Sequence, residues 1–66
     1  MLITVNGEGK ELPSGETLAA LLASLRLTAG RLACEVNREI VKRAEYDKTV
    51  LRDGDQVEIV QMIGGG

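Results

Sequence analysis

The 66-residue chain contains no histidine, a single cysteine and one aromatic residue, Tyr46. Without histidine there is no imidazole base, which excludes Ser-His and Cys-His nucleophiles and ordinary zinc sites. One cysteine cannot form an internal disulfide, so neither of the usual covalent or metal supports of very small folds is available. Any stable core must therefore be built from aliphatic side chains.

A strong charge of one sign is also missing, since the formal net charge is −2. Proteins that bind nucleic acid usually carry a marked basic excess, so we expect no nucleic acid partner. Residues 26–52 hold seven Lys or Arg and four acidic residues; an ordinary solvated surface explains this, although it could also steer an acidic partner. The longest apolar run, Leu18–Ala23, is too short for a membrane span, and no basic leader precedes it. We expect a cytoplasmic protein with no membrane partner.

Two short patterns resemble ligand sites but lack their essential parts. Gly7 and Gly9 form a lone Gly-x-Gly with no third glycine and no helix to hold a phosphate. Asp53, Asp55 and Glu58 lack the spacing of a calcium loop, and Asp-Gly-Asp is typical of a turn. The sequence therefore predicts neither a bound metal nor a bound cofactor.

The first half of the chain predicts a β-hairpin followed by one amphipathic helix. Residues 2–5 form a β-branched strand, residues 6–9 a turn, and residues 10–12 the returning strand. Thr17 is a suitable helix N-cap. The leucines at 18, 21, 22 and 25 then fall on one face of a helix.

The second half predicts three more strands. Residues 32–36 alternate apolar and polar side chains, residues 37–39 form a turn, and residues 40–42 a short strand. Residues 43–55 are irregular, and we expect the apolar pair Val50-Leu51 to pin this loop to the body. The last strand is expected over residues 56–63.

One helix cannot cover both faces of a sheet, so the predicted fold is α+β, with a mixed sheet and the helix packed across one face. If the first and last strands are parallel neighbours, this is the β-grasp arrangement of ubiquitin-like domains. Residues 1–63 form that domain and residues 64–66 a tail. Cys34 is expected inside, as a small apolar side chain rather than a nucleophile. The expected core side chains are Ile3, Val5, Leu12, Leu18, Leu21, Leu22, Leu25, Leu32, Cys34, Val36, Val57 and Ile59.

The chain ends in Gly64, Gly65 and Gly66, which fold stability does not explain. Glycine loses the most backbone entropy on ordering and buries no side chain, so we expect a flexible tail. A frayed end is one interpretation. The other is that the terminal carboxylate of Gly66 is the reactive group, because glycines can thread a narrow channel into the active site of a partner. Such a carboxylate is an anion and a poor electrophile, so the partner must activate it.

A tail that enters a partner requires the body to dock nearby, and the uncovered sheet face is the expected surface. Val60 and Met62 alternate with Val57 and Ile59, so they should point away from the helix, and Leu2 on the neighbouring strand is expected to join them. These three side chains are the predicted docking residues.

The order of several short patterns resembles the ThiS family, the small sulfur carrier proteins of thiamine biosynthesis, over essentially the whole chain. Lys42 stands where that family commonly has Pro, and Tyr46 where Trp is frequent. The matching pieces are Asn6-Gly7 after the first strand, Thr17-Leu18 at the helix start, Val36-Asn37, Ile40-Val41 with Arg43, Asp53-Gly54-Asp55, Val57-Glu58-Ile59 and the terminal Gly65-Gly66.

This resemblance implies that the chain is a protein co-substrate and not an enzyme. Gly66 would be adenylated by an E1-like adenylyltransferase, converted to a thiocarboxylate with sulfur from a cysteine desulfurase system, and used as sulfur donor by thiazole synthase. ATP and magnesium would belong to the activating enzyme. The same fold and tail also suit a small subunit of molybdopterin synthase, a carrier for another sulfur pathway or a ubiquitin-like modifier. A non-catalytic interaction module with an incidental glycine tail is a further alternative.

Overall fold

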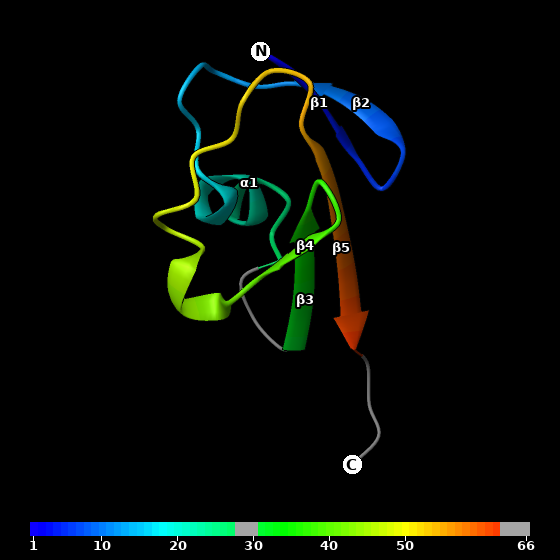
Figure 1. The fold of residues 1–66 in the computed structure, drawn as a ribbon, viewed down its shortest axis with the longest axis vertical. Helices are drawn as coiled ribbons and strands as arrows, with labels where there is room; N and C mark the ends of the chain where they lie inside the picture. Colours follow the sequence, from blue (N-terminus) through cyan, green and yellow to red (C-terminus); the bar gives the residue numbers. More distant parts are fainter. Residues whose placement is uncertain (28–30, 63–66) are drawn as a thin grey trace.

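The computed structural model describes residues 1–27 and 31–62, and of Met62 only the backbone. Three expectations fall outside the described residues: the connection at Gly30, the strand end at Ile63 and the glycine tail beyond the domain. The elements, drawn in Figure 1, are β1 (Leu2–Val5), β2 (Glu8–Glu11), α1 (Leu18–Ser24), β3 (Arg31–Val36), β4 (Glu39–Val41), the 3-10 helix η1 (Arg43–Glu45) and β5 (Gln56–Met62).

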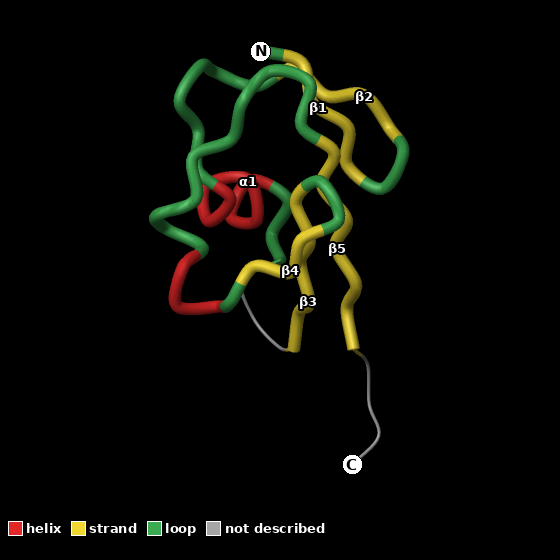
Figure 2. Tube along the Cα trace, viewed as in Figure 1, coloured by secondary structure: helices red, strands yellow, loops and turns green. Residues whose placement is uncertain are grey.

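The strands form a mixed sheet in the order β2-β1-β5-β3-β4. β1 and β5 are parallel, with Thr4 opposite Gln56 and Val5 opposite Val57, while the other neighbouring pairs are antiparallel. α1 lies on one side of this sheet, and none of the residues that the structure describes forms a helix on the opposite side (Figure 2). This confirms the predicted β-grasp arrangement.

The first hairpin turns over two residues, Asn6 and Gly7, whose φ angles are 51° and 84°. Positive φ at both positions gives the backbone twist that a two-residue hairpin loop requires, and asparagine and glycine tolerate it best. Val5 therefore faces Glu8, and β2 begins two residues earlier than the sequence predicted.

The second hairpin also turns over two residues, Asn37 and Arg38, with φ angles of 52° and 69°. The sequence interpretation gave this turn three residues and was wrong by one, because positive φ was not expected at an arginine. Val36 consequently pairs with Glu39, and β4 begins one residue earlier than predicted.

Thr17 caps α1 as predicted, since its Oγ1 accepts a hydrogen bond of 3.1 Å from the Ala20 amide. Of the expected core, Leu12, Leu25, Leu32 and Val36 are only half-buried and pack around its edge. The buried side chains are Ile3, Val5, Leu18, Leu21, Leu22, Cys34, Leu51, Val57 and Ile59.

The loop between η1 and β5 contributes Leu51 to this core, with an exposed fraction of 1%. The Leu51 amide donates to the Glu16 carbonyl at 2.9 Å, and the Leu18 amide donates to the Thr49 carbonyl at 2.9 Å. Leu51 thus pins the loop as expected. Val50, the other member of the pair, is instead 54% exposed.

Candidate functional site

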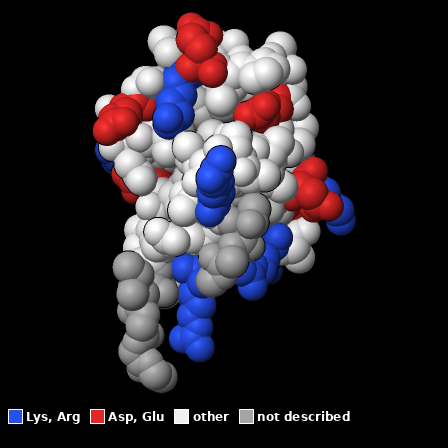
Figure 3. All heavy atoms as spheres, turned by 180° about the vertical axis from the view of Figure 1, so that it is seen from behind, with Lys and Arg blue, Asp and Glu red and all other residues white. Residues whose placement is uncertain are grey.

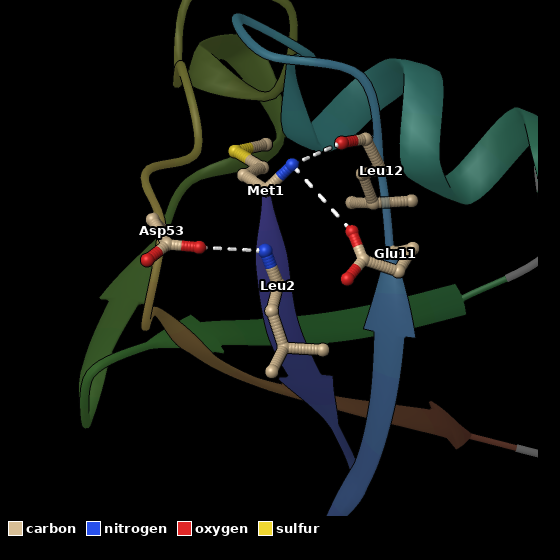
Figure 4. A network of polar contacts seen from close by, with 5 residues as sticks. All are labelled: Met1, Leu2, Glu11, Leu12 and Asp53. Carbon is tan, nitrogen blue, oxygen red and sulfur yellow. Dashed lines mark hydrogen bonds and ion pairs between the residues drawn. The ribbon is translucent and has the colours of Figure 1, made fainter.

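The acidic residues around Gly54 serve the fold. The Leu2 amide donates to an Asp53 carboxylate oxygen at 2.7 Å (Figure 4), and Asp55 accepts from the Arg52 amide at 2.8 Å and from Asn37 Nδ2 at 2.9 Å. Within residues 1–27 and 31–62, no group of three or more potential metal-ligating side chains converges. These carboxylates stabilise the turn that leads into β5.

Cys34 is completely buried on the helix-covered face, and its side chain is hydrogen-bonded to that of Tyr46. Burial first, and then this hydrogen bond, raise the pKa of Tyr46 above its ordinary value of 10.0. Both groups belong to the packing between sheet and loop. Neither side chain forms part of a nucleophilic centre.

The strand that leads to the glycine tail, β5, lies inside the sheet between β1 and β3. β1 pairs only with the start of β5, whereas β3 follows β5 down to the pair Arg31 and Met62. β5 therefore continues well past the end of β1, and its last residue lies away from the hairpin end of the molecule (Figure 1). Gly64, Gly65 and Gly66, the predicted reactive tail, lie outside the described residues.

Asn6 supports β5 where β1 ends. Its Oδ1 accepts a hydrogen bond of 2.8 Å from the Ile59 amide, and its Nδ2 donates one of 3.2 Å to the Ile59 carbonyl. The Asn6 backbone amide donates to the Val57 carbonyl at 2.9 Å. The Asn6 side chain therefore continues the hydrogen bonding between β1 and β5 by one further step. This contact ties β5 to the end of β1 at the point where the pairing of the two strands stops.

The uncovered sheet face carries exposed apolar side chains. Ile59 and Cys34 are buried under α1, so their alternating neighbours Val60 and Ala33 face the other way. Val60 is 58% exposed and lies opposite Ala33. The expected position of Val60 is thus confirmed, whereas the side chain of Met62 lies outside the described residues.

Leu2 is also exposed on this face, at 51%, but it does not adjoin Val60. Its carbonyl accepts a hydrogen bond from the Gly54 amide, two residues before the start of β5. In the parallel register Leu2 and Val60 are six positions apart, about 20 Å at roughly 3.3 Å per residue. The sequence analysis grouped them wrongly because the offset between β1 and β5 is a property of the assembled sheet.

Leu2 is instead held at the far end of β1 (Figure 4). The Met1 ammonium group donates to the Leu12 carbonyl at 2.7 Å and lies 3.7 Å from a Glu11 carboxylate oxygen. These contacts join the start of β1 to the end of β2. Leu2 accordingly belongs to the hairpin end of the open face.

The sequence analysis missed Ile40, which is 78% exposed. It faces Glu35, which in turn faces Glu58, so these three side chains form a row across β4, β3 and β5. The neighbouring row contains Ala33 and Val60. The observed two-residue turn at Asn37-Arg38 places Ile40 on this face. The three-residue turn predicted from the sequence shifts the strand by one position and so turns Ile40 to the other face. We call Ala33, Ile40 and Val60 the open-face patch.

The covered side has a small cavity of about 170 Å³. Its walls come from α1, η1 and the chain on either side of residues 28–30, and the lining residues are Ala19, Leu22, Leu27, Leu32, Arg43 and Tyr46. Most of this lining is aliphatic. The cavity brings no acid, base and nucleophile together.

Comparison with known proteins places the chain in a defined context. The ThiS family model matches residues 3–66. The sulfur carrier protein ThiS of Escherichia coli is 32% identical over 66 residues, which cover all of both chains. A crystal structure of the thiamine biosynthesis protein ThiS from Geobacter metallireducens has a TM-score of 0.85 and 32% identity, again over the full length of both.

A longer relative contains a similar segment. The thiazole synthase of Paramagnetospirillum magneticum is 39% identical over the 66 residues of this chain. The chain spans only about a fifth of the length of that protein. Among the described residues, moreover, no helix has the length and apolar character needed to cross a membrane.

Proposed function

The chain belongs to the ThiS family, and on that basis we propose that it is a sulfur carrier in thiamine biosynthesis. The carboxylate of Gly66 is the group that carries sulfur, and the rest of the chain positions it. The observation that carries this proposal is the extent of the family match, which runs through the terminal Gly65-Gly66.

The chemistry begins with the terminal carboxylate. With an ordinary pKa of about 3.3 to 3.7 it is an anion at neutral pH and resists nucleophilic attack. In the proposed reaction a carboxylate oxygen of Gly66 attacks the α-phosphorus of ATP on an E1-like adenylyltransferase, and pyrophosphate leaves. A persulfide of a desulfurase system then attacks the acyl carbon and displaces AMP. A second thiol cleaves the S–S bond of the resulting acyl disulfide and forms a disulfide with the sulfur donor, which releases the thiocarboxylate that donates sulfur to thiazole synthase. ATP and magnesium are held by the activating enzyme.

The fold supports this role through the position of β5. Three glycines span at most about 10 Å, so a partner must bind the body close to its own active site. β5 extends beyond β1 and precedes the glycine tail, while the open-face patch lies on the same strand and on β3 and β4. We propose that Val60 and Ile40 form the centre of the docking surface. Leu2 contributes only to a partner that spans the whole face, and Met62 would extend the surface toward the tail.

Deletion of Gly65 and Gly66 tests the proposal. The shortened chain is expected to keep its thermal unfolding midpoint, because glycine has no side chain to bury in the core. It is also expected to lose complementation of a thiazole auxotroph that lacks its own carrier. Growth supported by the shortened chain would contradict the proposal and favour a non-catalytic interaction module.

A further inference from the structure

Basic side chains lie at the end of the sheet where β5 finishes. Arg31 opens β3 and pairs with Met62, the last residue of β5. Lys42 directly follows β4, whose Val41 pairs with Cys34, so it reaches the same end of the sheet. Arg43 follows Lys42 as the first residue of η1.

The cavity described above places a fourth cation beside these three. Leu27, Leu32 and Arg43 line the same cavity, so the chain segments that bear them converge there. Arg26 directly precedes Leu27, and Arg31 directly precedes Leu32. Arg26, Arg31, Lys42 and Arg43 are all exposed, and we call them the basic end.

The other end carries charges of both signs. Glu11 lies beside the chain start, Asp53 and Asp55 lie in the turn before β5, and Lys10, Arg38 and Arg52 lie close to them. Near the basic end the acidic residues are Glu45, in η1 beside Arg43, and Asp47, which directly follows Tyr46. On the face drawn in Figure 3, the charged side chains of the lower part are Lys and Arg, whereas Asp and Glu lie higher, together with further Lys and Arg.

We propose that the basic end docks on an acidic rim around the active-site entrance of the adenylating enzyme and guides the glycine tail into it. This inference rests on the proposed function. Complementary charge chiefly raises the rate of association, and a cluster of one sign also orients the approaching molecule. Arg31 pairs with the last residue of β5, and Lys42 and Arg43 follow β4 on the far side of β3, so the attraction that brings the proteins together also turns the end of β5 toward the partner.

An acidic protein surface fits this end better than a nucleic acid does. The basic end is small, the opposite end carries charges of both signs, and the chain has one aromatic side chain with which to stack bases. A compact acidic rim on the partner contacts only the four cations of the basic end. The expected partner is therefore a protein with an acidic surface around an entrance that admits a narrow tail.

Paired charge reversals test the inference. R31E combined with K42E reverses two charges at the basic end. Arg38→Glu combined with Lys10→Glu makes the same net change away from it: Arg38 lies in the β3–β4 turn, and Lys10 lies in β2 at the hairpin end. The measurement is the association rate with the E1-like adenylyltransferase of the same organism at low and high salt, alongside ATP-dependent adenylation of the chain.

At low salt the basic-end variant is expected to associate about tenfold more slowly than the parent, with the difference shrinking at high salt, and the control pair less than about twofold more slowly. Equal rates for both variants, with normal adenylation of the parent, would overturn the inference and leave the proposed function intact. Absence of adenylation of the parent would overturn both. Binding of a labelled RNA oligonucleotide that R31E/K42E abolishes would also overturn the assignment to an acidic protein surface.

Discussion

Two asparagines connect segments that are distant in the sequence. The Asn6 side chain is hydrogen-bonded to both the amide and the carbonyl of Ile59. The Asn37 side-chain oxygen accepts from the Gln56 amide at 2.9 Å, and the Asn37 backbone amide donates to the Gln56 carbonyl at 2.7 Å. Both residues have positive φ, so each supplies a turn conformation and a side-chain clamp at once. The Asn-Gly pattern predicted the first role. The second could not be predicted, because it depends on which backbone groups the sheet brings alongside.

Replacing Asn6 with glycine isolates the clamp, because glycine tolerates positive φ without strain. We expect a loss of about 1 to 3 kcal/mol in the free energy of unfolding, since the Ile59 amide and carbonyl lose their partners. Urea denaturation measures this. Asn6→Asp keeps the acceptor for the Ile59 amide and should lose less. Equal stability of the parent and Asn6→Gly would contradict the role assigned to the side chain.

Tyr46 predicts an alkaline pH dependence. Its pKa is raised in the folded protein, mainly by burial and further by the hydrogen bond with Cys34, so the unfolded chain loses the phenol proton at a lower pH than the folded one. The stabilisation is therefore complete below about pH 10 and is lost as the pH rises through the folded pKa. Between about pH 9 and about pH 11, Tyr46→Phe should show a smaller fall in unfolding free energy than the parent. Parallel pH profiles would contradict this explanation.

At the scale of elements, the regular parts were predictable and the offsets between them were not. Period-two and helical patterns identified the strands, α1 and the Thr17 cap. Positive φ at Arg38 was not predictable from the residue type, and the resulting one-residue difference in the turn decided whether Ile40 would face α1 or solvent. Leu2 was likewise placed on the correct face, but its separation from Val60 along the strands emerges only when β1 and β5 pair.

The loop that carries Val50 and Leu51 offers a matched pair of variants. Leu51 is 1% exposed and Val50 is 54% exposed. Leu51→Ala should lower the free energy of unfolding by about 2 to 5 kcal/mol, because it leaves a cavity in the core. Val50→Ala should change it by less than about 1 kcal/mol. Similar losses for both variants would show that the loop does not pin the body through Leu51.

Considered as a whole, the sheet has one face covered by α1 and one face left open, and the proposed functional surfaces lie on the open face and at the end of β5. In the proposed function a chain with no histidine and a buried cysteine takes part in group transfer, because the chemistry needs only the terminal carboxylate and enzymes that supply activation and sulfur. The glycine tail predicts that carboxylate from the sequence, whereas the open-face patch required the register of three strands.

The open-face patch predicts a separation between docking and stability. Ile40→Ser and Val60→Ser should each weaken binding to thiazole synthase or to the adenylating enzyme by about tenfold, because both exposed side chains are removed from the centre of the proposed interface. Their unfolding midpoints should stay near that of the parent. Leu2→Ser is the matched control on the same face and should have the smaller effect on binding. An effect of Leu2→Ser that equals the other two would contradict the placement of the patch.

The central claim is that sulfur is carried on the C-terminal carboxylate of Gly66. Intact-mass spectrometry, with fragmentation of the C-terminus, tests it on chain incubated with the E1-like adenylyltransferase, ATP, magnesium and a cysteine desulfurase system. We predict a species in which one sulfur atom replaces one oxygen, located at Gly66 and absent when ATP is omitted or Gly65 and Gly66 are deleted. A chain whose mass stays unchanged, or sulfur found on Cys34 instead, would contradict the account.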